Sequence, residues 1–316
     1  MSLLHRLRAV RFDGLWWRRF AYLGSAYGPE WWKRYSPTWI AAILFACVGT
    51  NRRGAIANMQ RVLGRQGWLR DSWNGLQVFV SFAHSLNETL EFLSPRRQPM
   101  EIDHPAHDRI AKALATGRGA VFVTCHFGNW DVAAQSLSTY GVPVNLVMAR
   151  EANETTDEYV RAAREEAGLR VLISDGSVFR TFSMLRALRR REIVAMQLDR
   201  PLGGPGARQI EFFGAPAPFQ VGPLRLARSA QVPIFAAFVV RKGPRSYRIV
   251  VGEERTIPRN ATTLEVDHIL ASIVREFEDL VRADPSQWFQ FVPFWPADPS
   301  SEAAAPDERS RPARTG

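Results

Sequence analysis

Residues 121–131 read VFVTCHFGNWD, an apolar run followed directly by polar side chains and a glycine. The run is rich in β-branched and aromatic residues, and it predicts a buried strand that ends at His126. Gly128 indicates a tight turn, and Asn129 suits the N-cap of a helix whose first turn holds Asp131. Ligands of open α/β sheets bind at the carboxyl ends of the strands. We therefore expect His126 and Asp131 to lie at a functional site.

Strands and helices alternate around this stretch. Apolar runs that predict strands lie at 120–125, 144–148, 171–173, 192–198, 209–213, 234–240 and 247–251. Stretches that predict helices lie at 129–140, 155–167, 178–189, 222–229 and 263–281. This order is typical of a layered domain in which helices flank a sheet. We predict an α/β fold with a central, largely parallel mixed sheet.

The amino-terminal part predicts helices only. Apolar residues recur at spacings of three and four between residues 71 and 93, which indicates a helix with one buried face. We predict three regions: a helical region over residues 1–95, an α/β domain that carries the site over 96–296, and a disordered tail over 297–316.

Positive charge and tryptophan are concentrated in the helical region. The 316-residue chain has a formal net charge of +10, and residues 1–74 hold twelve Lys or Arg against three acids, with seven of the ten Trp. Indole rings favour the headgroup depth of a bilayer, and cations attract anionic lipid. We predict that this region associates with a membrane surface. The alternative is a soluble surface with several Trp in the core, which the adjacent pairs Trp16-Trp17 and Trp31-Trp32 disfavour.

Residues 35–51 form one uncharged run between basic pairs. A helix that begins at Ser36-Pro37 would be about 25 Å long, slightly short of a bilayer core. Such a helix fits insertion into one leaflet, a crossing of a thinned bilayer, or a place in the protein core. We expect the first, a monotopic insertion.

The sequence holds no pattern for a metal or a bound nucleotide. Its two cysteines, Cys47 and Cys125, each lie in an apolar run, so we expect both thiols to be buried and reduced. The chain lacks zinc-binding spacings, the G-x-S-x-G motif and the glycine-rich phosphate motifs. Cys125 and His126 would point to opposite faces of a strand, which excludes a Cys–His dyad. We expect no metal and no cofactor.

A histidine and a carboxylate together can activate a hydroxyl group. An imidazole with a pKa of about 6.5 takes a proton at neutral pH, and a carboxylate on its other nitrogen fixes the tautomer. Backbone N–H groups at the start of the next helix would bind developing negative charge. His126 and Asp131 thus suit acyl transfer to an alcohol. A purely structural pair, with Asp131 as a helix cap, fits the spacing equally well.

Residues 126–131 resemble the H-x4-D motif of the glycerolipid and lysophospholipid acyltransferases. The surrounding sequence is similar to the lipid A biosynthesis lauroyl/myristoyl acyltransferases and the phosphatidylinositol mannoside acyltransferases. The similar segments are Arg52-Arg53 with Asn58, Met148 to Arg150, Arg164 to Gly168, Gln197 to Pro201, Glu211 to Gly214, Gly222 to Ala227, Val232 to Ile234 and Asp284 to Trp288. After Trp288, FQFVPFW replaces the family's basic stretch, and Asp199-Arg200-Pro201 replaces an acid-rich glycine segment.

The resemblance implies a glycerol-3-phosphate acyltransferase-like fold and an O-acyltransferase. His126 would be the general base and Asp131 the residue that orients it. The residues expected to bind substrate are Arg150, Arg164, Asp199, Gly128, Asn129 and Phe213. A structural ion pair is a nearly equal alternative for Arg150, and a plain core position is an equal one for Phe213.

The implied donor is an acyl thioester on acyl carrier protein or coenzyme A, both anionic and suited to a basic surface. The implied acceptor is a hydroxyl of a bacterial glycolipid or related polar lipid. The expected location is the cytoplasmic face of the bacterial inner membrane, as a peripheral or monotopic protein. The alternatives are a catalytically inactive membrane scaffold and a lipid hydrolase of the same fold. We expect no nucleic-acid partner, because no nucleic-acid-binding motif accompanies the basic charge.

Overall fold

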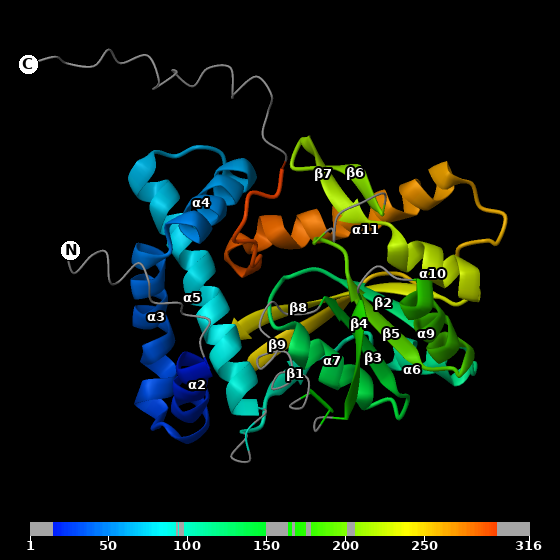
Figure 1. The fold of residues 1–316 in the computed structure, drawn as a ribbon, viewed down its shortest axis with the longest axis horizontal. Helices are drawn as coiled ribbons and strands as arrows, with labels where there is room; N and C mark the ends of the chain where they lie inside the picture. Colours follow the sequence, from blue (N-terminus) through cyan, green and yellow to red (C-terminus); the bar gives the residue numbers. More distant parts are fainter. Residues whose placement is uncertain are drawn as a thin grey trace, which may run out of the picture.

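The centre of the protein is a seven-stranded mixed sheet with the order β1-β9-β8-β2-β5-β3-β4 (Figure 1). The computed structural model describes residues 15–92, 94, 98–149, 164–165, 168–174, 178–200 and 206–295. The strands are β1 (Glu101–Asp103), β2 (Ala120–Thr124), β3 (Val144–Ala149), β4 (Leu169–Ser174), β5 (Ile193–Gln197), β8 (Ile234–Gly243) and β9 (Ser246–Val251). Five of them run parallel, whereas β1 and β9 run the opposite way. The predicted α/β fold with a largely parallel mixed sheet is confirmed.

Helices cover both faces of this sheet because the central strands are apolar on both sides. Val121 and Val123 of β2 belong to the same apolar cluster as α9, α10 and α11. Ala120 and Phe122, which point the other way, pack with α6 and α7. The helices are α6 (His107–Ala115), α7 (Trp130–Ser138), α9 (Val178–Arg189), α10 (Gly222–Ala230) and α11 (Thr263–Ala283). β2 therefore lies in the middle layer, with helices packed on both of its faces.

A second sheet of two antiparallel strands lies beside α11 and consists of β6 (Ala207–Phe212) and β7 (Ala215–Gln220). The sequence analysis missed β7, since Pro216 and Pro218 argue against a strand. The structure tolerates both prolines because β7 pairs with β6 alone and needs no ladder of hydrogen bonds on its other side. The short elements β1 and α6 were also missed.

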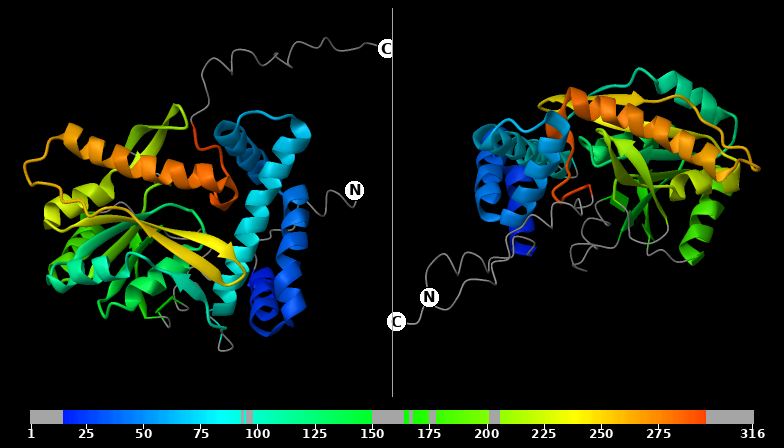
Figure 2. Two further views of the ribbon diagram at one scale, coloured as in Figure 1. Left: turned by 180° about the vertical axis from the view of Figure 1, so that it is seen from behind. Right: turned by 90° about the horizontal axis from the view of Figure 1, so that it is seen from above.

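Four helices stand together at the side of the sheet (Figures 1 and 2). They are α2 (Leu15–Tyr27), α3 (Glu30–Cys47), α4 (Gly49–Leu63) and α5 (Trp68–Phe92). The long helix α5 packs against the other three. Figure 2 shows the β8–β9 hairpin reaching toward α5. The four helices therefore lie next to the turn that joins β8 and β9.

Helix α3 begins at Glu30 rather than at Ser36, and Pro37 lies inside it. A proline leaves the carbonyl four residues earlier without its N–H donor. That carbonyl belongs to Lys33, and the Asn87 side chain of α5 donates to it at 3.4 Å. Tertiary contact thus compensates the missing helical bond, which explains why the predicted helix start was wrong.

The uncharged run is divided between two helices. α3 ends at Cys47, and the chain turns by 102° into α4. Within the described residues no single helix is long and apolar enough to cross a bilayer, whereas α3 and α4 taken together meet that criterion by length and composition. Both cysteines are free, and Cys125 is buried as expected, but Cys47 is exposed because it lies at the solvent side of α3. Most of the predicted helix at 155–167 and the predicted tail at 297–316 lie outside the described residues.

Candidate active site

The strand β2 places His126 just beyond its carboxyl end, where the chain turns sharply. Gly128 has a φ of +59°, and a Cβ atom there would lie 1.8 Å from the carbonyl oxygen of Val239 in β8. Only glycine combines this backbone conformation with so close an approach. Gly128 also donates its N–H to the Gln287 carbonyl at 2.9 Å. These contacts explain the glycine structurally, and its role in substrate binding stays a prediction.

The carboxylate that holds the His126 ring belongs to Asp199. His126 Nδ1 lies 2.8 Å from Asp199 Oδ1, and the His126 backbone N–H donates to both carboxylate oxygens at 3.0 Å. The strand register explains this contact. Thr124 of β2 pairs with Gln197 of β5, and His126 and Asp199 each lie two residues beyond this pair. The orienting role was predicted for Asp131, whereas the carboxylate that contacts the His126 ring in the structure is that of Asp199.

This contact decides which nitrogen of the ring is basic. Burial of Asp199 opposes its ionisation, but the contact with His126 outweighs burial and holds the pKa of this carboxyl below its ordinary value. An ionised carboxylate only accepts, so the ring proton lies on Nδ1. With the proton on Nδ1, Nε2 is the nitrogen left to accept a proton, and among the described residues none makes a hydrogen bond to it. The arrangement leaves Nε2 as a base.

Asp131 lies in the first turn of α7 and is bound to Arg164. The Nε of Arg164 donates to Asp131 Oδ1 at 2.8 Å, and its Nη1 lies 2.7 Å from the sulfur of Met148. Asp131 and Arg164 are buried. They lie close to the His126–Asp199 pair, here called the dyad, because the ring of Trp130, next to Asp131, packs edge-on against His126 at 5.4 Å. The structure therefore brings Arg164 to the predicted site. Arg150 lies outside the described residues.

Asn129 precedes α7, but its side chain does not cap the helix as expected. Its Nδ2 donates to the Ser85 carbonyl and the Tyr247 hydroxyl, both at 3.2 Å, and its Oδ1 accepts from Thr89 at 3.0 Å. Both ends of the amide are thus committed to α5 and β9. Asn129 anchors the turn after His126, and the first turn of α7 has no side-chain cap.

Trp288 is a site residue to which the sequence analysis gave no role. Its indole N–H donates to Asp199 Oδ2 at 3.2 Å, and the Gln290 side chain donates to the Asp199 carbonyl at 3.4 Å. Trp288 is fully buried. The available signal was its place in the segment Asp284 to Trp288, which resembles the family's closing motif.

Phe213 lies at the turn between β6 and β7, with a φ of +49°. Its N–H donates to Glu278 at 3.0 Å, and its ring lies 4.9 Å from the Arg282 guanidinium. Its neighbour Phe212 is fully buried and packs edge-on against Trp288 at 5.4 Å. Phe212 therefore reaches the cluster around Asp199, and the acyl-binding role expected for Phe213 stays a prediction.

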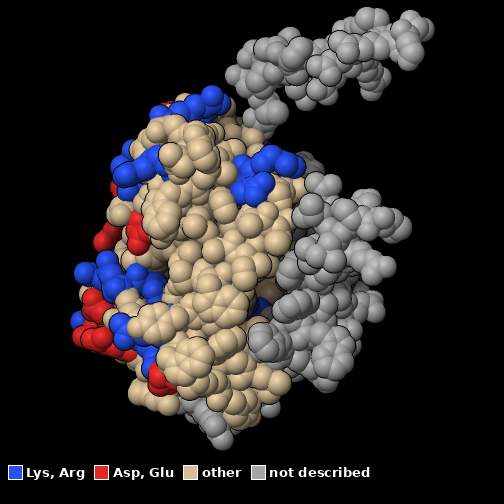
Figure 3. Space-filling model, turned by 90° about the vertical axis from the view of Figure 1, so that its left-hand side faces the viewer, with Lys and Arg blue, Asp and Glu red and all other residues tan. Residues whose placement is uncertain are grey.

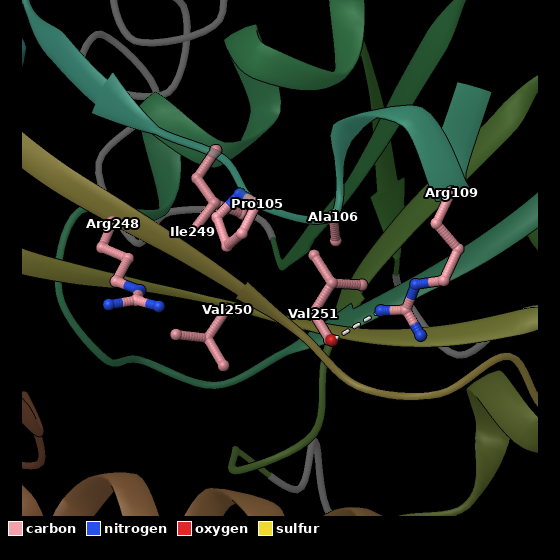
Figure 4. Close-up of a pocket in the computed structure, with 7 residues that line it drawn as sticks. All are labelled: Pro105, Ala106, Arg109, Arg248, Ile249, Val250 and Val251. Carbon is pink, nitrogen blue, oxygen red and sulfur yellow. Dashed lines mark hydrogen bonds between the residues drawn. The ribbon is translucent and has the colours of Figure 1, made fainter.

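The described residues provide no metal site, and the cavity beside β9 lies apart from His126 and Asp199. No group of three His, Cys, Asp or Glu is placed to hold a metal among the described residues. A cavity of about 360 Å³ lies between β9 and the start of α6 (Figure 4). In Figure 4, Arg109 spans one side of this cavity and donates to the Val251 carbonyl at 2.8 Å. Neither His126 nor Asp199 lines it.

Comparison with known proteins agrees with the geometry. A family model described as bacterial lipid A biosynthesis acyltransferase matches residues 7–296. The phosphatidylinositol mannoside acyltransferase of Mycobacterium tuberculosis (strains CDC 1551 / Oshkosh and ATCC 25618 / H37Rv) is 30% identical over 209 residues, which is 65% of this chain and 63% of that protein. The protein of the same name from Mycolicibacterium smegmatis is 29% identical over 200 residues, 63% of this chain and 64% of its own length.

The chain thus matches just under two thirds of the length of these curated relatives. The family match extends much further, since it includes the four amino-terminal helices, the whole sheet and the segment that holds Trp288. The chain belongs to the bacterial lipid A biosynthesis acyltransferase family.

Proposed function

We propose that this protein transfers a fatty acyl chain from an acyl thioester to a hydroxyl of a bacterial glycolipid or related polar lipid. The observation that carries the proposal is the 2.8 Å contact between His126 Nδ1 and Asp199, which leaves Nε2 as a base at the carboxyl end of β2. Membership of the family supports acyl transfer, and the names of the two mycobacterial relatives support a glycolipid acceptor.

In the proposed reaction, Nε2 of His126 takes the proton of the acceptor hydroxyl while its oxygen attacks the thioester carbonyl carbon. The tetrahedral intermediate collapses, the carbon–sulfur bond breaks, and the leaving thiolate takes the proton back from the imidazolium. The products are an ester and a free thiol. Asp199 stabilises the positive charge that His126 carries in between. Its ionised state at neutral pH suits this role.

The negative charge on the carbonyl oxygen requires donors. The first turn of α7 begins four residues after His126 and carries no side-chain cap. The Val132 N–H donates to the Asn129 carbonyl, so the N–H groups of Trp130 and Asp131 are the ones suited to bind an oxyanion. Arg164 lies against the same turn through Asp131 and adds positive charge. In this role Asp131 holds Arg164 in place instead of orienting the histidine.

We further propose that the protein works at the cytoplasmic face of the bacterial inner membrane, with α3 on the bilayer. Trp31, Tyr35, Trp39 and Ile43 recur every four residues along α3 and are 45–62% exposed. Figure 3 shows this side as a broad, mostly uncharged surface, with Lys and Arg beside it and some Asp and Glu at its left and lower edges. The exposed apolar side chains of α3, with cations nearby, suit an anionic lipid headgroup layer.

The donor in this proposal is an acyl thioester of acyl carrier protein or coenzyme A. Both carriers are anionic, and the chain has a formal net charge of +10. The mechanism above needs no metal or cofactor, since the base, its orienting carboxylate and the oxyanion donors all come from the chain.

Lipid mass spectrometry of cells that lack this protein tests the proposal, with complementation by wild type or by His126→Ala. We expect one lipid class to lose a single acyl chain and to recover it with wild type only. Recovery with both proteins would instead support an inactive scaffold. A purified protein that releases free fatty acid, and no acylated lipid, from its donor would support a hydrolase.

A further inference from the structure

Both members of the dyad are held by one short segment after α11. We call residues 287–295 the closing segment. The backbone N–H of Phe289 donates to the His126 carbonyl at 2.7 Å, and the indole of Trp288 donates to the Asp199 carboxylate at 3.2 Å. The closing segment therefore contacts the backbone beside the base and the carboxylate that orients it.

The closing segment is held in turn by Asn58 of α4. Asn58 Nδ2 donates to the carbonyls of Gln290 and Val292 at 3.0 and 2.8 Å, and its Oδ1 accepts from the Phe294 N–H at 3.0 Å. Asn58 is 1% exposed. A primary amide has two N–H donors and one oxygen, and here each of these groups is engaged by the closing segment. Asn58 is thus saturated by protein and has no donor left for a substrate.

The helix and the closing segment also approach each other unusually closely. Gly54 lies one turn before Asn58 on the same face of α4, and a Cβ atom at this glycine would be 2.2 Å from the Phe291 carbonyl oxygen. The absent side chain lets the backbone of the closing segment lie within reach of the short Asn58 amide. Figure 2 shows this segment running between the amino-terminal helices and the sheet.

We propose that Asn58 is a positioning residue for the dyad, which acts through the closing segment on Asp199 and His126. The amino-terminal helices are then part of the catalytic apparatus as well as a membrane surface. The inference rests on the proposed function, because positioning matters only if His126 and Asp199 do the chemistry. A displacement of about 1 Å at reacting groups can cost on the order of a hundredfold in rate.

The test uses the full-length protein in detergent micelles, with palmitoyl-CoA as donor and the acceptor lipid found by the experiment above. Asn58→Ala and Trp288→Phe are compared singly and together. Asp71→Ala is the matched control: Asp71 is also buried and joins α4 to α5 by accepting from Gln60 at 2.7 Å, but its hydrogen-bond partners are Gln60 and Gln66 and not the closing segment.

We expect each single change to lower kcat by about tenfold to a hundredfold, with KM for the donor within about twofold, because binding is retained and alignment is lost. The double variant should be no slower than the slower single variant, since both changes break one chain of contacts. Asp71→Ala should lower the thermal midpoint but leave kcat of the folded protein within about twofold. The downfield proton resonance of the His126–Asp199 hydrogen bond should move or disappear in Asn58→Ala and in Trp288→Phe, but not in Asp71→Ala.

Two results would overturn the inference: a loss of kcat in Asn58→Ala no greater than in Asp71→Ala, or effects of Asn58→Ala and Trp288→Phe that multiply independently. Failure of the proposed function looks different, because the wild-type protein itself would then transfer no acyl group. The proton resonance reports the geometry without any activity, so an unchanged resonance in Asn58→Ala would overturn the inference in that case as well.

Discussion

Asp199 contacts the His126 ring, whereas Asp131 contacts Arg164. Substituting these two aspartates should therefore affect activity differently. Asp199→Asn keeps the shape of the side chain but removes the charge that holds Nδ1–H and balances the imidazolium. We expect kcat to fall by roughly 10²–10⁴-fold at neutral pH. Asp131→Asn leaves that contact intact and weakens the hold on Arg164, so we expect a smaller loss that includes a higher KM. Steady-state kinetics of both variants checks this, and a larger loss for Asp131→Asn would contradict the assignment.

The sequence predicted Asp131 as the partner of His126, whereas the structure places Asp199 against the ring. Asp131 is five positions away along the chain, whereas Asp199 is 73 residues away and meets His126 through the register of two parallel strands. Register between strands depends on the whole sheet and is not visible in a local motif. Trp288 was overlooked for the same reason, since its partner is again a distant carboxylate.

At the scale of elements, α4 approaches the closing segment through Gly54. An alanine there would bring a methyl group against the Phe291 carbonyl, which is backbone and cannot move aside like a side chain. We expect Gly54→Ala to destabilise the protein by roughly 1–3 kcal/mol. Gly222→Ala is the control, because a Cβ atom at this helical glycine meets nothing within 4 Å. Urea denaturation of both variants measures the difference, and equal midpoints would show that the segment moves without cost.

Three elements meet at Glu91, which is buried on α5. It accepts from Lys33 of α3 at 2.8 Å and from Arg245 of the β8–β9 turn at 2.7 Å. Burial raises the pKa of Glu91, but the hydrogen bonds from Arg245 and Lys33 outweigh it and hold this pKa below its ordinary value of 4.5. Because the folded pKa is depressed, the stabilisation is complete above pH 4.5 and is lost as the pH falls through the folded value.

We therefore expect Glu91→Gln to lower the free energy of unfolding by roughly 3 kcal/mol at pH 7, because the buried Lys33 loses its carboxylate partner at 2.8 Å and keeps only the exposed Glu30 at 3.7 Å. Below pH 4.5 the difference from wild type should shrink, since protonation removes the same charge from the natural protein. Glu30→Gln is the control, because Glu30 is 67% exposed and should matter by less than about 1 kcal/mol. Urea denaturation across this pH range gives the result, and a difference independent of pH would contradict the argument.

The elements themselves were largely predictable from periodicity. The central strands β2 and β8 are buried on both faces, so they appear in the sequence as continuous apolar runs. The sequence did not predict β7, which contains two prolines, or β1, whose three residues are exposed. Both strands form because they pair with a neighbouring strand, and this pairing is not visible in their own sequence. The start of α3 was misplaced because a side chain on another helix replaces the hydrogen bond that Pro37 lacks.

For the whole molecule, composition indicated a basic, Trp-rich helical region but not how it joins the sheet. The structure shows that the same helices present apolar residues outward along α3 and reach the dyad inward through Asn58. The proposed membrane binding and the proposed catalysis should then be separable, because the residues that support them lie on different helices, α3 and α4. Substitutions on the outward face are expected to change lipid binding and leave the dyad intact.

Trp39→Glu tests this separation, because Trp39 lies on the outward face and is 45% exposed. The change removes apolar area and adds a negative charge facing anionic lipid, so we expect affinity for vesicles with anionic headgroups to fall at least about tenfold. Leu264→Glu on α11, at a side chain 64% exposed, should bind vesicles like wild type. Flotation with vesicles measures binding, and thiol labelling of the exposed Cys47 should slow on vesicles for wild type only. If both variants float with vesicles equally well, the lipid-binding surface lies elsewhere. If only Trp39→Glu loses vesicle binding and its kcat in micelles is unchanged, α3 is the surface through which the protein binds the membrane.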